Sequence, residues 1–154
     1  MIPSHASSPA ATARHRGAQA AHRINVLLYS DDVTTRDAVR VGVGRRPAKD
    51  VEVASWRECA TAPAVIEGAE SGEFDLLSLD GESAPFGGLG LCRQLKNEIF
   101  RCPPILVLTG RPQDGWLAAW SMADLAVPHP LDPLALSSAV AELGRAVVRQ
   151  TPTD

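Results

Sequence analysis

Acidic side chains follow two of the apolar segments of this sequence. Asp31 and Asp32 come shortly after the run at residues 25–29, and Asp80 ends the run at residues 75–79. Carboxylates that converge repel one another, so the pKa of one of them must rise unless a cation lies between them. Mg²⁺ suits such a place, because it commonly takes one or two carboxylates, keeps several waters and completes its shell with phosphate oxygens. If the two runs are neighbouring strands, these residues predict a magnesium site.

Two further polar residues follow later apolar runs. Thr109 comes after residues 104–108, and His129 follows residues 125–127 within the sequence Val-Pro-His-Pro. Both could face a phosphoryl group carried by Asp80, with a hydroxyl donor on one side and an imidazole on the other. An alternative for His129 is a loop histidine held between two prolines with no role in a site.

The elements that must position these residues alternate between strand and helix. The strong apolar runs lack polar alternation, which is typical of strands covered on both faces; a weaker run lies at residues 51–54. Helical segments follow the strands at about residues 33–43, 61–71, 91–99, 112–122 and 133–147. Such alternation predicts an α/β fold with one doubly wound parallel sheet. In the five-stranded order 2-1-3-4-5, the first and third strands are neighbours, and ligands bind at their carboxyl ends.

Several helix ends have capping signals. Asp32, with Thr34 or Thr35 as alternatives, can cap the first helix, and Gly72 suits the C-terminal end of the second. In the fourth helix, Trp116 and Trp120 lie four residues apart and therefore on one face. They are candidates for a partner surface because aromatic residues are enriched among interface anchors. The alternative is that one or both cover the sheet.

Length and composition predict one soluble domain and exclude several functions. The chain has 154 residues, 45% of them hydrophobic, and a formal net charge of -3. An acidic balance argues against direct nucleic-acid binding, and no apolar run approaches the roughly 18 residues that membrane insertion requires. Three cysteines without C-x-x-C spacing support neither a zinc ribbon nor a disulfide framework, so we expect a cytoplasmic protein.

The first 23 residues differ in composition from the rest. They contain three arginines, no acidic residue and no apolar period, so we expect a flexible tail at residues 1–23, a domain at 24–149 and a short tail at 150–154. The remaining chain carries 12 basic against 18 acidic residues, which makes the N-terminal segment a weakly basic arm on an acidic domain. A docking or localisation arm and a plain solvated terminus are both open.

From about residue 24 to 149 the sequence resembles the receiver domain of two-component response regulators. In that family an acidic pair ends the first strand, a phosphoacceptor Asp ends the third, a Thr or Ser ends the fourth and Lys-Pro follows the fifth. The order and approximate spacing of all four blocks match here. The matching residues are Ser30, Asp31, Asp32, Asp80, Thr109, His129 and Pro130.

The resemblance implies roles for these residues. Asp80 would be the phosphoacceptor, and Asp31, Asp32, Asp80 and the backbone carbonyl of Glu82 would hold Mg²⁺. Thr109 and His129 would contact the phosphoryl group. A histidine kinase would supply that group, and a cytosolic protein partner would receive the signal.

Three departures from the family pattern bear on function. Ser30 occupies the first position of the acidic pair, judged by its spacing to Arg36, and Ala126 stands where many receivers have a switch aromatic. His129 replaces the lysine; an unperturbed imidazole is only about one quarter protonated at pH 7, whereas a lysine is fully charged. We therefore expect weak magnesium binding and impaired or absent switching.

The expected function is that of an atypical single-domain response regulator, not an enzyme. The sequence ends about five residues after the last helix, so its output is expected to act in trans through protein–protein interaction. Mg²⁺-dependent phosphorylation of Asp80 would switch it; the alternative within this class is a phosphorylation-independent adaptor. A flavodoxin-like small-molecule binder is a further alternative, but the acids at residues 31 and 32 would repel a phosphate there.

Overall fold

The computed structural model describes residues 21–150. Five of their segments are strands that form one parallel sheet. The strands are β1 (His22–Tyr29), β2 (Val51–Cys59), β3 (Leu76–Asp80), β4 (Ile105–Thr109) and β5 (Leu125–Pro128). Their order is β2-β1-β3-β4-β5, and every neighbouring pair is parallel. The predicted fold class and strand order are therefore confirmed.

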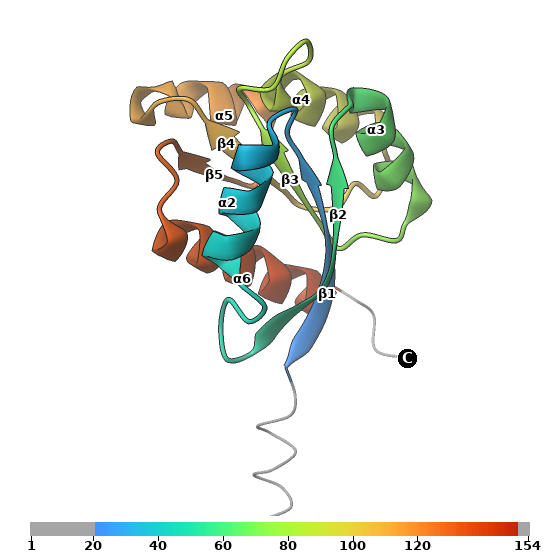
Figure 1. Cartoon of the computed structure of the whole chain (residues 1–154). Helices are drawn as coiled ribbons and strands as arrows, with labels where there is room; N and C mark the ends of the chain where they lie inside the picture. Colours follow the sequence, from blue (N-terminus) through green and yellow to red (C-terminus); the bar gives the residue numbers. More distant parts are fainter. Residues whose placement is uncertain (1–20, 151–154) are drawn as a thin grey trace, which may run out of the picture.

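Helices cover both faces of this sheet (Figure 1). They are α2 (Val33–Val43), α3 (Ala62–Ser71), α4 (Gly88–Glu98), the short 3₁₀ helix η1 (Pro112–Asp114), α5 (Gly115–Ser121) and α6 (Pro133–Gln150). Buried residues of α2 and α6 form one apolar cluster with one face of the sheet, and those of α3, α4 and α5 form a second cluster with the other face. Within the described range, no helix combines the length and apolarity needed to cross a membrane.

The ends of the helices follow from local sequence. The Asp32 side chain caps α2 by accepting a hydrogen bond from the Thr34 N–H, and Thr61 caps α3 in the same way through Ala64. At the end of α3, Gly72 adopts the left-handed conformation with φ 76°, which glycine accepts without steric cost. The segment at 112–122, predicted as one helix, is divided into η1 and α5 and closes at Met122 with φ 69°.

The central strands β3 and β4 are buried along their whole length, as their continuous apolar sequences predicted. The edge strand β2 is longer than the predicted residues 51–54, because it pairs with all of β1 across a bulge at Ile24 and Asn25. Its second half carries the exposed residues Arg57 and Glu58, as is common on an edge strand facing solvent.

The first strand begins at His22, two residues before residue 24, where the sequence analysis places the start of the domain. The His22 N–H donates to the Asp50 carbonyl at 2.8 Å, and Arg23 pairs with Glu52 across the β1–β2 ladder, so both residues belong to the sheet. At the other end, α6 extends through Gln150, one residue past the predicted limit. The remainder of the two predicted tails, residues 1–20 and 151–154, lies outside the described residues.

The reactivity of the three cysteine thiols depends on how deeply each is buried. It raises the pKa of Cys92 to about 11 and also raises the pKa of Cys59 and Cys102. Because the thiolate is the reactive form, we expect Cys92 to be labelled slowest by a disulfide reagent at pH 8, and Cys102, which is only half-buried, to be labelled faster. Peptide mapping of the native protein against time measures both rates. Equal labelling rates for Cys92 and Cys102 would contradict the burial of Cys92 on the inner side of α4.

Candidate functional site

The predicted site residues lie at the carboxyl edge of the sheet. Tyr29 of β1 pairs with Leu79 of β3, which brings the next residues, Ser30 and Asp80, beside each other. On the other side of Asp80, Thr109 ends β4, and its carbonyl accepts a hydrogen bond from the His129 N–H at 2.8 Å. The strand order therefore gathers the polar residues of four separate sequence blocks at one place.

The carboxylate of Asp80 is buried, with 2% of the residue exposed, and protein donors satisfy both of its oxygens. The Ser30 hydroxyl donates to Oδ2 at 2.8 Å, and the Glu82 N–H donates to Oδ1 at 3.0 Å. His129 Nε2 lies 3.6 Å from the same Oδ1, beyond hydrogen-bonding distance. Among the residues that the structure describes, this buried nitrogen has no hydrogen-bond partner, so His129 faces Asp80 without bonding to it.

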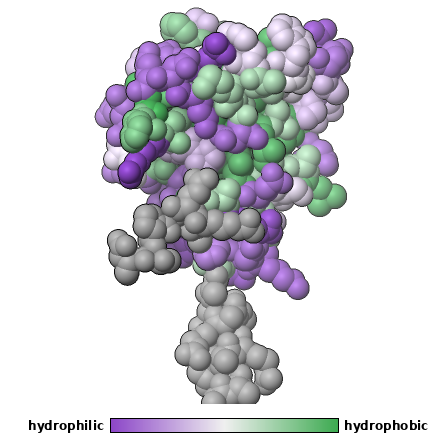
Figure 2. Space-filling view, turned by 180° about the vertical axis from the view of Figure 1, so that it is seen from behind, coloured by the Kyte–Doolittle hydropathy of each residue, from purple (hydrophilic) through white to green (hydrophobic). Residues whose placement is uncertain are grey.

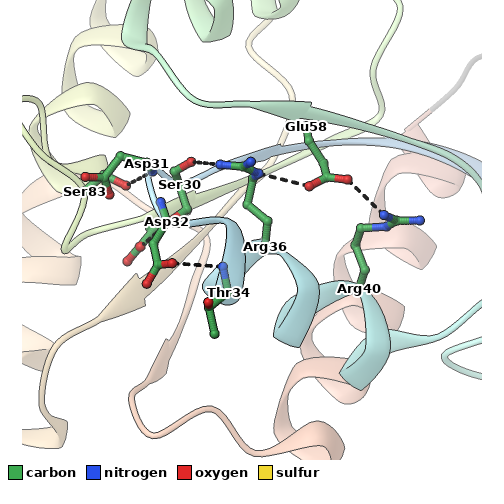
Figure 3. A network of polar contacts seen from close by, with 9 residues as sticks. Ser30, Asp31, Asp32, Thr34, Arg36, Arg40, Glu58 and Ser83 are labelled. Atoms are coloured by element: carbon green, nitrogen blue, oxygen red, sulfur yellow. Dashed lines mark hydrogen bonds and ion pairs between the residues drawn. The ribbon is translucent and has the colours of Figure 1, made fainter.

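The two acids after β1 have different environments (Figure 3). Asp32 turns its carboxylate to the first turn of α2, where it accepts from the Thr34 N–H at 2.9 Å and from the Thr35 hydroxyl at 3.4 Å. The side chain of Asp31 is exposed, and its backbone N–H donates to the Ser83 hydroxyl at 3.0 Å. Of the two functions open to Asp32, helix cap and metal ligand, the structure shows the cap.

The predicted magnesium ligands differ in what their side chains contact. Within residues 21–150, no three His, Cys, Asp or Glu side chains are grouped so that they could hold a metal ion. Ser30 contributes a hydroxyl where the family pattern has a carboxylate, and that hydroxyl donates its proton to Asp80. Asp32 is engaged by the backbone of α2. The Ser30 hydroxyl and the Asp32 carboxylate are thus engaged by other groups of the protein, whereas the Asp31 carboxylate is exposed at the same edge of the sheet, and the magnesium site stays a prediction.

An ion-pair network fixes the connection between β1 and α2. Arg36 donates to the Ser30 carbonyl at 2.7 Å and to Glu58 Oε1 at 3.0 Å, while Arg40 donates to Glu58 Oε2 at 2.9 Å (Figure 3). The network ties the edge strand β2 to the helix and to the backbone of Ser30. Through Ser30 it positions the hydroxyl that bonds to Asp80.

Tyr29 links the site to the loop that follows β3, a contact that the sequence analysis missed. Its hydroxyl donates to the Phe86 carbonyl at 2.6 Å. Burial, with a smaller contribution from the charge of Asp31, raises the pKa of Tyr29, so the hydroxyl stays protonated and keeps donating at neutral pH. An aromatic residue with a polar tip at the end of a buried strand is the only signal in the sequence for this contact.

The loop after β3 crosses the loop after β4 at a glycine, Gly110. The Glu82 carboxylate passes directly over Gly110, in space that the Cβ of any other residue would occupy. Glu82 therefore lies over Gly110, the residue after β4, and contacts Asp80 through its backbone N–H. Its predicted contribution, a carbonyl ligand to a metal, stays a prediction.

The two tryptophans of α5 lie on the surface and not over the sheet. Trp116 is 67% exposed and Trp120 is 47% exposed. The guanidinium of Arg93, on α4, stacks over the Trp120 ring at 4.8 Å from its centroid and donates to the Trp120 carbonyl. The arrangement leaves one aromatic ring largely free and holds the other in place.

Comparison with known proteins shows a consistent set of relatives. No family model matches the sequence. Two proteins of Mycobacterium tuberculosis, from strains CDC 1551 and H37Rv and both named uncharacterized response regulatory protein, are each 50% identical over 123 residues. The match covers 80% of this chain and 92% of each relative.

Solved structures share the fold at lower identity. The receiver domain of AraT from Geobacillus stearothermophilus is 21% identical with a TM-score of 0.63, covering 82% of this chain and 97% of that domain. A CheY-like receiver domain protein from Methanospirillum hungatei is 18% identical with a TM-score of 0.62, covering 83% and 98%.

The bond between Ser30 and Asp80 predicts a measurable loss of stability in Ser30→Ala. The substitution removes a donor from a buried carboxylate and an acceptor from the Asp32 N–H, which lies 3.1 Å from the Ser30 hydroxyl. We expect the free energy of unfolding to fall by about 1–3 kcal/mol, as measured by urea denaturation at pH 7.

Ser138→Ala provides the matched control, because Ser138 is exposed on α6. Its effect should stay within about 0.5 kcal/mol. Similar losses in the two variants would show that Asp80 does not depend on Ser30.

Proposed function

Because the chain belongs to the response regulator family and has the fold of its receiver domain, we propose that it is a signalling domain that acts by binding other proteins in the cytoplasm and not by catalysis. The two Mycobacterium tuberculosis relatives support action in trans, since the match leaves only 8% of each relative outside it, too little for an output domain. A protein of this type transmits its state through its surface.

We further propose that binding does not depend on phosphorylation of Asp80. The observation that carries this proposal is the hydrogen bond from Ser30 to Asp80, at a position where an acid would help to hold Mg²⁺. Phosphoryl transfer to a carboxylate relies on metal ions to offset the charge that develops. With Ser30 as a donor and Asp32 as a helix cap, the residues present favour a site that keeps receiver geometry without its metal-dependent reaction.

The second candidate function is a phosphorylation switch, with a histidine kinase as the donor of the phosphoryl group. Asp80, Thr109 and His129 lie together at the carboxyl edge of the sheet, as that function requires. Phosphate on Asp80 would bring negative charge towards His129, whose buried Nε2 has no other partner. That geometry is the specific observation in favour of this candidate.

Intact mass separates the two candidates. We expect no phosphate adduct when the full chain is incubated with Mg²⁺ and a small phosphodonor at pH 6, 7 and 8. The physical reason is that neither Ser30 nor Asp32 supplies the missing carboxylate to a metal.

The double variant Ser30→Asp, His129→Lys serves as the gain-of-function control and should acquire an adduct, which Asp80→Asn should remove. Stoichiometric phosphorylation of the wild-type chain, absent in Asp80→Asn, would establish the switch in place of the adaptor.

The exposed tryptophans are the proposed partner surface. Exposed aromatic rings on a small acidic domain are costly to leave in water, and burial of such a ring is frequently the largest single contribution to an interface. Trp116 is the stronger candidate because Arg93 already covers part of Trp120.

This surface is tested by immobilising the protein and measuring how much of each protein it captures from a cytosolic extract. We expect Trp116→Ala to weaken capture of a specific partner by about 30-fold, the effect of losing roughly 2 kcal/mol at an interface. Asp80→Asn should capture as much as the wild type.

Phe100→Ala is the control: it removes another exposed aromatic ring, in the loop between α4 and β4, and should leave capture of the partner unchanged. Loss of capture in Asp80→Asn would instead tie binding to the state of Asp80.

A further inference from the structure

A hollow of about 390 Å³ lies between α3 and α4, on the face opposite to α2 and α6. None of its lining residues is charged, and Gln94 is the only one with a polar side chain. Figure 2 shows this side of the molecule, where apolar residues interrupt a largely polar surface. The lining of the hollow includes Ile66, Phe86, Gly90, Leu91 and Gln94.

An acidic hollow continues this apolar one along α3. Pro63 and Ile66 line both, and the second adds Glu67 and Glu70, which lie one turn apart on the helix. Both carboxylates are exposed, and neither forms an ion pair within the described part of the chain. No basic residue of the described chain, residues 21–150, lines either of these places. The apolar hollow and this acidic patch on α3 adjoin at Pro63 and Ile66; together they are the α3–α4 groove, apolar at one end and negative at the other.

Two features leave the apolar end open for an incoming side chain. Gly90 faces empty space, since a Cβ built there would meet no atom within 4 Å. Phe86, at the rim, is 60% exposed and is among the large apolar residues of this face that the sheet does not bury. Exposed apolar surface next to a hollow commonly marks a site of interaction.

The groove is connected to the site around Asp80. Phe86 belongs to the loop that follows Asp80, and its carbonyl is held by the Tyr29 hydroxyl at 2.6 Å. The same loop ends at Gly87, the N-cap of α4. An occupant of the groove would therefore contact a segment whose position depends on the end of β1 and on Asp80.

We propose that the α3–α4 groove binds a segment of another protein that inserts an apolar side chain beside Phe86 and Gly90 and places Lys or Arg against Glu67 and Glu70. The occupant follows from complementarity: the apolar end rejects charge because a charge there would lose its hydration without a partner, and the acidic end attracts basic side chains. The proposal rests on the proposed function, action through a partner protein, and adds a surface separate from the tryptophans of α5.

Two synthetic peptides with the same apolar residues, flanked either by Lys or by Glu, test the groove. Titrated into the ¹⁵N-labelled full chain, the Lys peptide should bind at least tenfold more tightly, with shifts of amide resonances centred on Gly87, Gly90 and Leu91. The double variant Glu67→Lys, Glu70→Lys should reverse the preference. Equal affinity of the two peptides for the wild type would overturn the proposal.

Gly90→Leu should fill the groove and weaken the Lys peptide at least tenfold, without loss of fold, because leucine is the better helix former. Gly115→Leu is the matched control: Gly115 also faces open space, but it precedes Trp116 on α5. If Gly115→Leu alone weakens binding, the α5 surface is the site and the groove proposal fails while the proposed function stands.

Two results would assign another occupant and overturn the proposal. Self-association of the wild type that Gly90→Leu abolishes would make a second copy of this chain the occupant. A tenfold gain in affinity for the Lys peptide in the double variant Arg14→Glu, Arg16→Glu would show that the chain's own N-terminal segment competes with the peptide and is the occupant of the groove.

Discussion

The buried carboxylate of Asp80 is the constraint on which this site depends. An ionised group at the end of a central strand is costly to bury unless donors reach both oxygens. Here the donors come from two different places in the chain: the Ser30 hydroxyl at the end of β1 and the Glu82 N–H in the loop after β3. The Ser30 hydroxyl is available only because β1 and β3 are neighbours in the sheet, whereas the Glu82 N–H is a local donor two residues after Asp80.

The surrounding interactions hold those donors in position. Arg36 fixes the backbone of Ser30 and is itself held by Glu58 on the edge strand, while Tyr29 fixes the loop after Asp80 through the Phe86 carbonyl. On the remaining side, His129 is placed by the backbone pairing of β4 and β5 and not by its own side chain. The site is therefore rigid towards β1 and has an unsatisfied group towards β5.

Two of the three departures from the family pattern, Ser30 and His129, change the same balance of charge around Asp80. A receiver that lacks one carboxylate has less negative charge to balance, and therefore less need for a metal ion or a permanent lysine charge beside Asp80. Ser30 supplies a neutral donor, and His129 lies close without an ion pair of normal hydrogen-bonding length. The hydrogen bonds to Asp80, together with the ion pairs of Arg36 and Arg40 with Glu58, hold the geometry that the structure shows. The remaining surfaces, the α5 tryptophans and the α3–α4 groove, lie on the same side of the sheet, where the second apolar cluster anchors α3, α4 and α5.

The sequence by itself indicated the alternation of strands and helices, because apolar periodicity and caps are local, and the resemblance to receiver domains implied the strand order that brings Asp80, Thr109 and His129 to one edge. Only the tertiary structure decided what each polar side chain bonds to. Asp32 had two possible partners, and the nearby N–H groups of α2 take its carboxylate, since a local hydrogen bond needs no further chain ordering. The function of Ser30 depends on an oxygen that lies 50 residues away in the chain. A pattern within one segment cannot show that two residues so far apart in the chain are in contact. The pairing of β1 with β3 brings them together.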